Sequence, residues 1–156
     1  MRILIVAVGV RMPHWVAAGF DDYRARMPRD ARIELKEVKP EKRAAGMAVA
    51  RVLERESERI EAALPESCLR LALDEHGRSF DSVAFARQFA KWRGAGRDIA
   101  FLVGGADGLS AVLKSSATML LSLSPLTLPH GLARMVLAEQ LYRAHTLTIG
   151  HPYHRA

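Results

Sequence analysis

The stretch FLVGGADGLSAVLKSSATMLLSLSPLTLPHGLAR, residues 101–134, contains two apolar runs that each end in a loop suited to close backbone approach. The first run, residues 99–103, is continuously apolar, which is typical of a parallel strand covered on both faces, and it ends at Gly104 and Gly105. The second, residues 119–123, leads into residues 124–131, where two prolines and a glycine interrupt regular structure before a long helical pattern. Because open α/β sheets bind ligands at the carboxyl ends of their strands, we expect a ligand site here.

Strand and helix patterns alternate along the whole chain, which predicts an α/β fold with a mainly parallel sheet and helices on both faces. We expect one domain, residues 1–156. The strand at 33–38 alternates only partly, so it is placed at a solvated edge of the sheet. Residues 74–79, DEHGRS, are expected to form a turn before a helix capped by Ser79 or Asp81. The expected strands are 3–8, 33–38, 69–73, 98–103 and 119–123, and the expected helices are 13–27, one ending near 64, one ending near 92, 109–116 and 129–146.

Two of these helices have apolar residues at helical spacing, which predicts that they pack on the sheet. An aromatic stripe in the first helix is read as core and not as a platform for stacking bases, because its spacing matches an amphipathic face. The stripe in the first helix is Trp15, Val16, Phe20 and Tyr23, and the stripe in the helix ending near 64 is Val49, Val52, Leu53, Ile60 and Leu64.

The charge of the chain favours a polyanionic partner. Lys and Arg number 23 against 17 Asp and Glu, a formal net charge of +6. Basic composition also occurs in proteins without such a partner, so the net charge alone does not show that this chain binds a polyanion. The basic cluster Lys36, Lys39, Lys42 and Arg43 fits either RNA phosphates or a solvated loop. Cys68 is the single cysteine, and no export or membrane-spanning pattern is present, so we expect a cytoplasmic protein that does not enter a membrane.

The motifs GGADG, LSLSPLTLPHGLARMVLAEQLYRA and HPYHR, together with the opening LIVAVGVRMPHWV, closely resemble one known family. They are similar to the small bacterial methyltransferases of the SPOUT class that modify N3 of a pseudouridine in large-subunit (23S) ribosomal RNA. This resemblance covers nearly the whole chain. It implies a carboxyl-terminal trefoil knot that binds S-adenosylmethionine, a homodimer, and ribosomal RNA or the assembled ribosome as partner.

The resemblance also implies which residues hold the cofactor. In the family, the loops of the knot hold the adenosine and methionine parts largely through backbone groups. Gly105 and Gly108 can serve either the cofactor or the turn alone. The matching positions are Leu73, Gly104, Gly105, Leu123, Ser124, Pro125, Leu126, Thr127 and Leu128.

Four residues within the matching motifs are candidates for catalysis: His130, Arg134, His154 and Arg155. The imide nitrogen N3 must lose its proton around the time of attack, so a base or an anion-stabilising cation is needed. His130 can instead fix the start of its helix by a bond to the backbone, and the spacing of four places Arg134 on its face. Tyr153, His154 and Arg155 are expected to bind substrate. A non-catalytic RNA-binding module with the same fold is the competing hypothesis.

Overall fold

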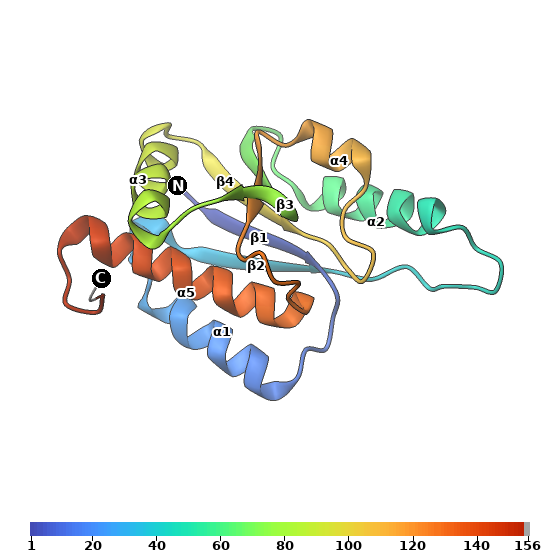
Figure 1. The fold of residues 1–156 in the computed structure, drawn as a ribbon, viewed down its shortest axis with the longest axis horizontal. Coiled ribbons are helices and arrows are strands. Elements are labelled where there is room, and N and C mark those ends of the chain that lie inside the picture. The colour runs from blue at the N-terminus through green and yellow to red at the C-terminus, as the bar shows by residue number, and fades with distance from the viewer. Residues whose placement is uncertain (155–156) are drawn as a thin grey trace.

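A computed structural model describes residues 1–154, in which five strands form one parallel sheet in the order β2-β1-β4-β3-β5 (Figure 1). This confirms the α/β fold with helices on both faces. The trefoil knot stays a prediction. The strands are β1 Ile3–Val8, β2 Ile33–Val38, β3 Cys68–Ser79, β4 Asp98–Val103 and β5 Met119–Ser122; the helices are α1 His14–Arg26, the 3₁₀ turn η1 Arg29–Ala31, α2 Val49–Ala63, α3 Ser82–Gly94, α4 Ala111–Ser116 and α5 His130–Ile149.

The core lies on both faces of the sheet, and β1, which lies between β2 and β4, has six residues that are all buried. Ile3, Ile5 and Ala7 point into one core cluster, together with buried residues of α1, α3 and α5. The alternate residues of β1, Leu4 and Val6, join a second cluster that includes residues of α2 and α4. This two-sided burial explains why β1 and β4 are continuously apolar. As predicted, β2 is an edge strand.

The third strand is longer than expected, and the turn expected over residues 74–79 is wrong. β3 continues to Ser79, pairing first through Leu73 and later through Arg78 with the same residue, Leu121 of β5. The polar composition of this segment is turn-like, but long-range pairing with β5 overrides it. Asp81 is the actual cap of α3: its Oδ1 accepts a hydrogen bond from Ala84 N at 2.7 Å.

Two residues of the expected helical stripes lie outside the core. Trp15 is 60% exposed, although Val16 and Phe20 of the same stripe are buried. Val49 is 51% exposed because it is the first residue of α2, while Val52 and Ile60 further along are buried.

None of the helices within residues 1–154 has the length and apolar character that crossing a membrane requires.

Gly77 permits β3 and β5 to approach at the irregular part of their pairing. A Cβ built on Gly77 would lie 2.6 Å from the carbonyl carbon of Leu120 and 2.7 Å from the nitrogen of Leu121. Backbone atoms cannot move aside as a flexible side chain can. The close contact of β5 with β3 therefore depends on the missing side chain.

We predict that Gly77→Ala lowers the free energy of unfolding by about 1–3 kcal/mol, because overpacking strains the β3–β5 pairing. Gly94→Ala is the matched control, since nothing lies within 4 Å of its Cβ position at the end of α3. This control should be neutral or stabilising by about 0.5–1 kcal/mol. Urea denaturation of both variants measures the difference, and equal stabilities would contradict the packing argument.

Candidate functional site

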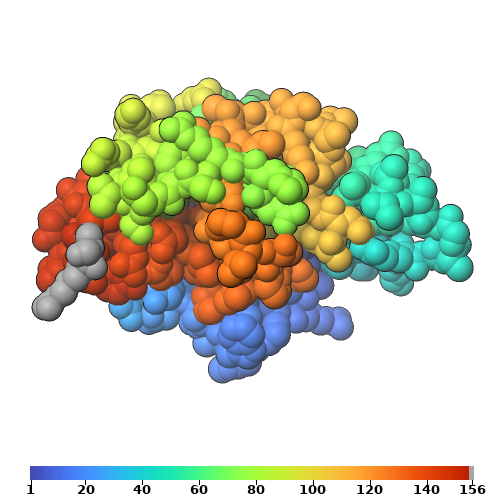
Figure 2. All heavy atoms as spheres, viewed as in Figure 1, coloured from blue at the N-terminus to red at the C-terminus, as the bar shows by residue number. Residues whose placement is uncertain are grey.

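One cavity of about 730 Å³ lies where the ends of β3, β4 and β5 meet. Three chain segments line it: 73–76 of β3, 103–108 after β4, and 121–130 from β5 to the start of α5. Parallel strands bring these segments together because their carboxyl ends share one edge of the sheet. In Figure 2 the segment that follows β5, in dark orange, lies on the visible face below the green end of β3.

The glycine loop after β4 is shaped by a close backbone approach. A Cβ on Gly104 would lie 2.3 Å from the carbonyl carbon of Gly108, and Gly108 N donates to Gly105 O at 3.1 Å in an isolated antiparallel bridge. Gly108 itself has a φ of 76°, which favours glycine. A side chain at Gly104 would therefore displace the loop and alter the cavity wall. Gly108 is fixed by this turn geometry, and it also lines the cavity.

The loop after β5 is held in place by short hydrogen bonds of its own side chains. Ser124 Oγ accepts from Leu126 N at 2.9 Å, and Ser122 Oγ donates to Ser124 O at 3.0 Å. Thr127 Oγ1 donates to Glu75 Oε2 at 2.8 Å, which connects this loop to the end of β3. These contacts fix the loop before any ligand enters, so it needs little ordering on binding.

Most of the expected cofactor residues meet at this cavity. Pro125 is the exception and does not line it. The residues that line it are Leu73, Gly104, Gly105, Leu123, Ser124, Leu126, Thr127 and Leu128.

Charged groups at the β3 side of the cavity were not assigned from the sequence. Asp74 and Lys114 form an ion pair of 2.5 Å at the wall. The bond from Lys114, aided by the His76 backbone N–H at 2.8 Å, holds the pKa of Asp74 below its usual value. Asp74 follows the apolar run of β3 directly, and Lys114 comes from α4, so only the fold brings them together.

His130 is half-buried at the cavity and is the first residue of α5. Its Nε2 would lie 3.3 Å from a Cβ on Gly9, so the ring stands against the loop after β1. Within residues 1–154 no hydrogen bond to this ring is present, so a structural bond to the backbone does not account for it. Its ring is thus available to a ligand.

Arg134 lies behind the cavity wall and does not line it, although it follows His130 by four residues. Its side chain is 1% exposed. Nη2 donates to the carbonyls of Val8 and Gly9 at 3.2 and 2.7 Å, and Nη1 donates to Glu37 Oε2 at 2.9 Å. Arg134 therefore joins the first turn of α5, which begins with His130, to β1 and β2, and a catalytic role for it stays a prediction.

The residues expected to bind substrate lie at the other end of α5. Tyr153 packs on Tyr142 with ring centroids 4.7 Å apart, and its hydroxyl donates to Glu139 Oε1 at 3.1 Å. Burial, the hydrogen bond to the Tyr23 hydroxyl at 3.4 Å and the charge of Glu139 raise the pKa of Tyr153. His154 is half-buried, and its buried Nδ1 has no hydrogen-bond partner within residues 1–154. Arg155 lies outside the described residues.

We expect Arg134→Met to lower the free energy of unfolding by about 2–4 kcal/mol, because each buried carbonyl left unpaired costs about 1–3 kcal/mol. Arg51→Met is the control, since Arg51 pairs with Glu54 on the surface of α2 with both side chains at least 50% exposed. That change should stay within about 1 kcal/mol. Thermal and urea unfolding measure both, and a neutral Arg134→Met would contradict the stabilising role of these contacts.

Comparison with known proteins identifies the family. The family described as "Predicted SPOUT methyltransferase" matches residues 1–154. Proteins named ribosomal RNA large subunit methyltransferase H are 54% identical: that of Bordetella pertussis over 156 residues, all of both chains, and that of Ralstonia pickettii over 155 residues, 99% of both.

A solved structure supports the fold at low sequence identity. A probable methylase family protein from Haemophilus influenzae Rd KW20 superposes with a TM-score of 0.54 and 13% identity, covering 99% of this chain and 70% of that one. The family match over residues 1–154 and the 54% identity over the full length show the family. The chain belongs to the SPOUT methyltransferase family.

Proposed function

We propose that this protein transfers a methyl group from S-adenosylmethionine to N3 of a pseudouridine in 23S ribosomal RNA. The observation that carries the proposal is the 54% identity, over full length, to proteins named ribosomal RNA large subunit methyltransferase H. The resemblance of the motifs to the pseudouridine-N3 methyltransferases supplies the target atom. The net charge of +6 suits a polyanionic substrate.

The cavity fits the cofactor by size and by wall chemistry. Its volume of about 730 Å³ lies in the range of small-molecule sites, about 300–1,000 Å³. Gly104 leaves a surface without a side chain at the wall, and the loop 123–128 presents backbone groups beside Leu123 and Leu126. When bound, S-adenosylmethionine supplies a methyl group on a sulfonium, which is a good leaving group. The protein then has to position the two reactants and to accept one proton.

His130 is the group within the same chain best placed to accept the N3 proton. It lines the cavity, and its ring has no partner within the described residues. As N3 forms its bond to the methyl carbon, the bond from that carbon to sulfur breaks and the N3 proton moves to a base. An imidazole is suited to this role because its ordinary pKa lies near neutral pH. Arg134 and Glu37 hold the helix start from which His130 projects.

The tail does not line the cavity of its own chain. It folds back along α5, where Tyr153 contacts Tyr142 and Glu139. These two residues follow His130 by twelve and nine positions, about 14–18 Å along the helix at about 1.5 Å per residue. In Figure 1 α5 begins near the middle of the molecule and ends at one side of it. A role of His154 in methyl transfer is therefore assigned to the cavity of a second copy, in the homodimer that the resemblance implies.

We predict that Gly104→Ala weakens S-adenosylmethionine binding at least tenfold, because its Cβ would collide with Gly108. Gly94→Ala is the control, since a Cβ on Gly94 meets nothing within 4 Å and Gly94 does not line the cavity. Calorimetric titration measures both affinities, and circular dichroism checks folding. An unchanged affinity for Gly104→Ala would place the cofactor elsewhere. If the wild-type protein binds neither S-adenosylmethionine nor its demethylated product, the non-catalytic RNA-binding module is favoured.

We predict that Gly104→Ala and His154→Ala each abolish most methyl transfer to ribosomes and that mixing the two variants restores part of it. A hybrid dimer contains one intact cavity served by one intact tail. The variants are unfolded and refolded together, and each is refolded alone as the control. Incorporation of labelled methyl into ribosomal RNA is the readout. Mixtures no more active than the separate variants would show that the tail does not act on a second copy.

A further inference from the structure

Two loops at the ends of β1 and β2 border the cavity on the side away from β3. The loop 9–13 lies against His130 and Arg134 through Gly9, and Gly9 N donates to Val38 O at 2.8 Å, next to the start of the loop 39–48. An ion pair between Arg43 and Asp107 joins the loop 39–48 to the glycine loop of the cavity. Both loops are therefore fixed to the cavity wall.

Arginine side chains neutralise three carboxylates of this surface. Glu37 pairs with Arg134 at 2.9 Å, and Glu41 pairs with Arg59 at 2.6 Å. Asp107 pairs with Arg43. These three pairs leave no net charge, and a fourth carboxylate, Glu56, is buried and accepts a hydrogen bond from Glu41 N. The cations that remain in the two loops and in β2 outnumber it, so they carry a surplus of positive charge.

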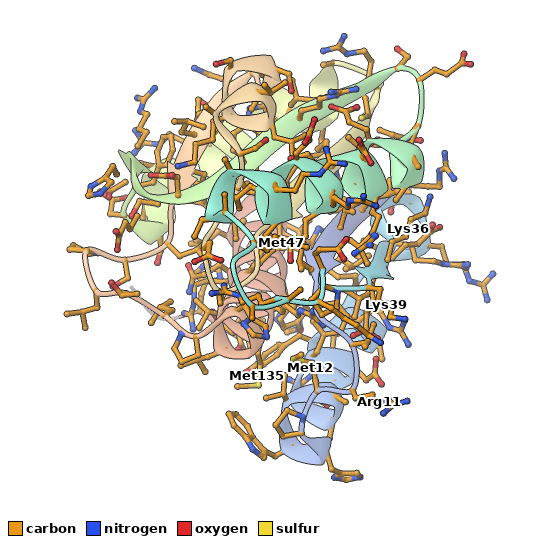
Figure 3. The ribbon with its side chains drawn as sticks, turned by 90° about the vertical axis from the view of Figure 1, so that its right-hand side faces the viewer. Arg11, Met12, Lys36, Lys39, Met47 and Met135 are labelled. Atoms are coloured by element: carbon orange, nitrogen blue, oxygen red, sulfur yellow. The ribbon has the colours of Figure 1, made fainter. Side chains whose placement is uncertain are left out.

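The surplus consists of four residues, which we call the basic rim: Arg11, Lys36, Lys39 and Lys42. Within residues 1–154 none of the four forms an ion pair; Lys36 Nζ donates to the carbonyl of Ala63 at 2.8 Å. Arg11, Lys39 and Lys42 are exposed. Figure 3 looks onto this end of the molecule and shows Arg11, Lys36 and Lys39 along one side of it.

Arg11 has a backbone conformation that side chains rarely adopt. Its φ is 59°, and within residues 1–154 it is the one residue other than glycine with a positive φ. Such a conformation costs of order 1 kcal/mol and persists where the surroundings enforce it, often at functional sites. The following residue, Met12, packs against α5, where its Sδ would lie 3.1 Å from a Cβ on Gly131. Arg11 itself is exposed to solvent.

The opposite border of the cavity has no such surplus of positive charge. Asp74 is neutralised by Lys114, and the carboxylate of Glu75 is balanced by the nearby exposed Arg78. A polyanion that inserts one nucleotide into the cavity is therefore attracted more strongly by the first border. The charges favour that side for the RNA backbone.

We propose that the basic rim binds the phosphates of ribosomal RNA next to the target nucleotide. This inference rests on the proposed function, and it adds the side of the cavity on which the RNA backbone lies. Each cation that neutralises a phosphate contributes about 0.7–0.9 to the slope of log affinity against log salt. Lysines on a loop suit this role because each acts as a flexible point charge.

The test compares two double variants that each remove two positive charges. Lys39→Gln with Lys42→Gln changes the basic rim, and Arg87→Gln with Lys91→Gln changes two exposed residues of α3, at the other end of the sheet. Binding of purified large ribosomal subunits is measured over a series of KCl concentrations. The rim variant should weaken binding about tenfold near 0.15 M salt and reduce the slope by about 1.4–1.8. The control variant should show nearly the wild-type affinity and nearly the wild-type salt slope.

Three outcomes would overturn the proposal: an unchanged slope for the rim variant, an equal loss in the control, or a changed oligomeric mass of the rim variant, which would mean that the rim contacts a second copy. Cofactor affinity by calorimetry is measured in parallel and should be unchanged. If the rim variant binds RNA normally while the wild type still methylates ribosomes, the rim assignment fails and the proposed function stands. If the wild type does not bind cofactor, the proposed function fails.

Discussion

Close backbone approach at two glycines determines the shape of the cavity. At Gly77 the extended end of β3 meets the backbone of β5, and at Gly104 the loop after β4 folds against Gly108. Any side chain at either position would separate segments that are now in direct contact. The parallel sheet brings the three strand ends to one edge, and these contacts bring their loops together. The cavity depends on both conditions.

Arginines and lysines have different tasks around this cavity. Arg134, Arg43 and Arg59 each pair with a carboxylate and join segments that are far apart in the sequence. The planar guanidinium suits such fixed contacts, since it can donate in several directions at once. The lysines of the basic rim have no such partners within residues 1–154; Lys39 and Lys42 are exposed, and Lys36 donates to the carbonyl of Ala63. The excess of positive charge is therefore local and lies beside the cavity.

The hydrophobic pattern of the sequence predicted the strands, the parallel sheet and the loops of the cavity. The apolar runs gave the strands, the order of strand and helix gave the parallel sheet, and the loops 104–105 and 123–128 were expected at one site. Tertiary pairing decided the rest. The polar residues 74–79 form strand because β5 pairs with them, and Trp15 is exposed although its spacing matches a buried face. The spacing of four residues placed Arg134 and His130 on one face of the helix. It could not show that Arg134 is buried against β1 and Glu37. Nor could the sequence show that the tail folds back along α5 and does not line the cavity of its own chain.

Mass analysis of nucleosides from large-subunit ribosomal RNA tests the central claim most directly. Ribosomes are taken from a strain that lacks this protein and are incubated with the purified protein and S-adenosylmethionine. The proposed function predicts that one pseudouridine per 23S chain gains a single methyl group at N3, and that RNA from the parent strain already carries it. A missing methyl group in the treated ribosomes, or one on another nucleoside, would contradict the proposed reaction.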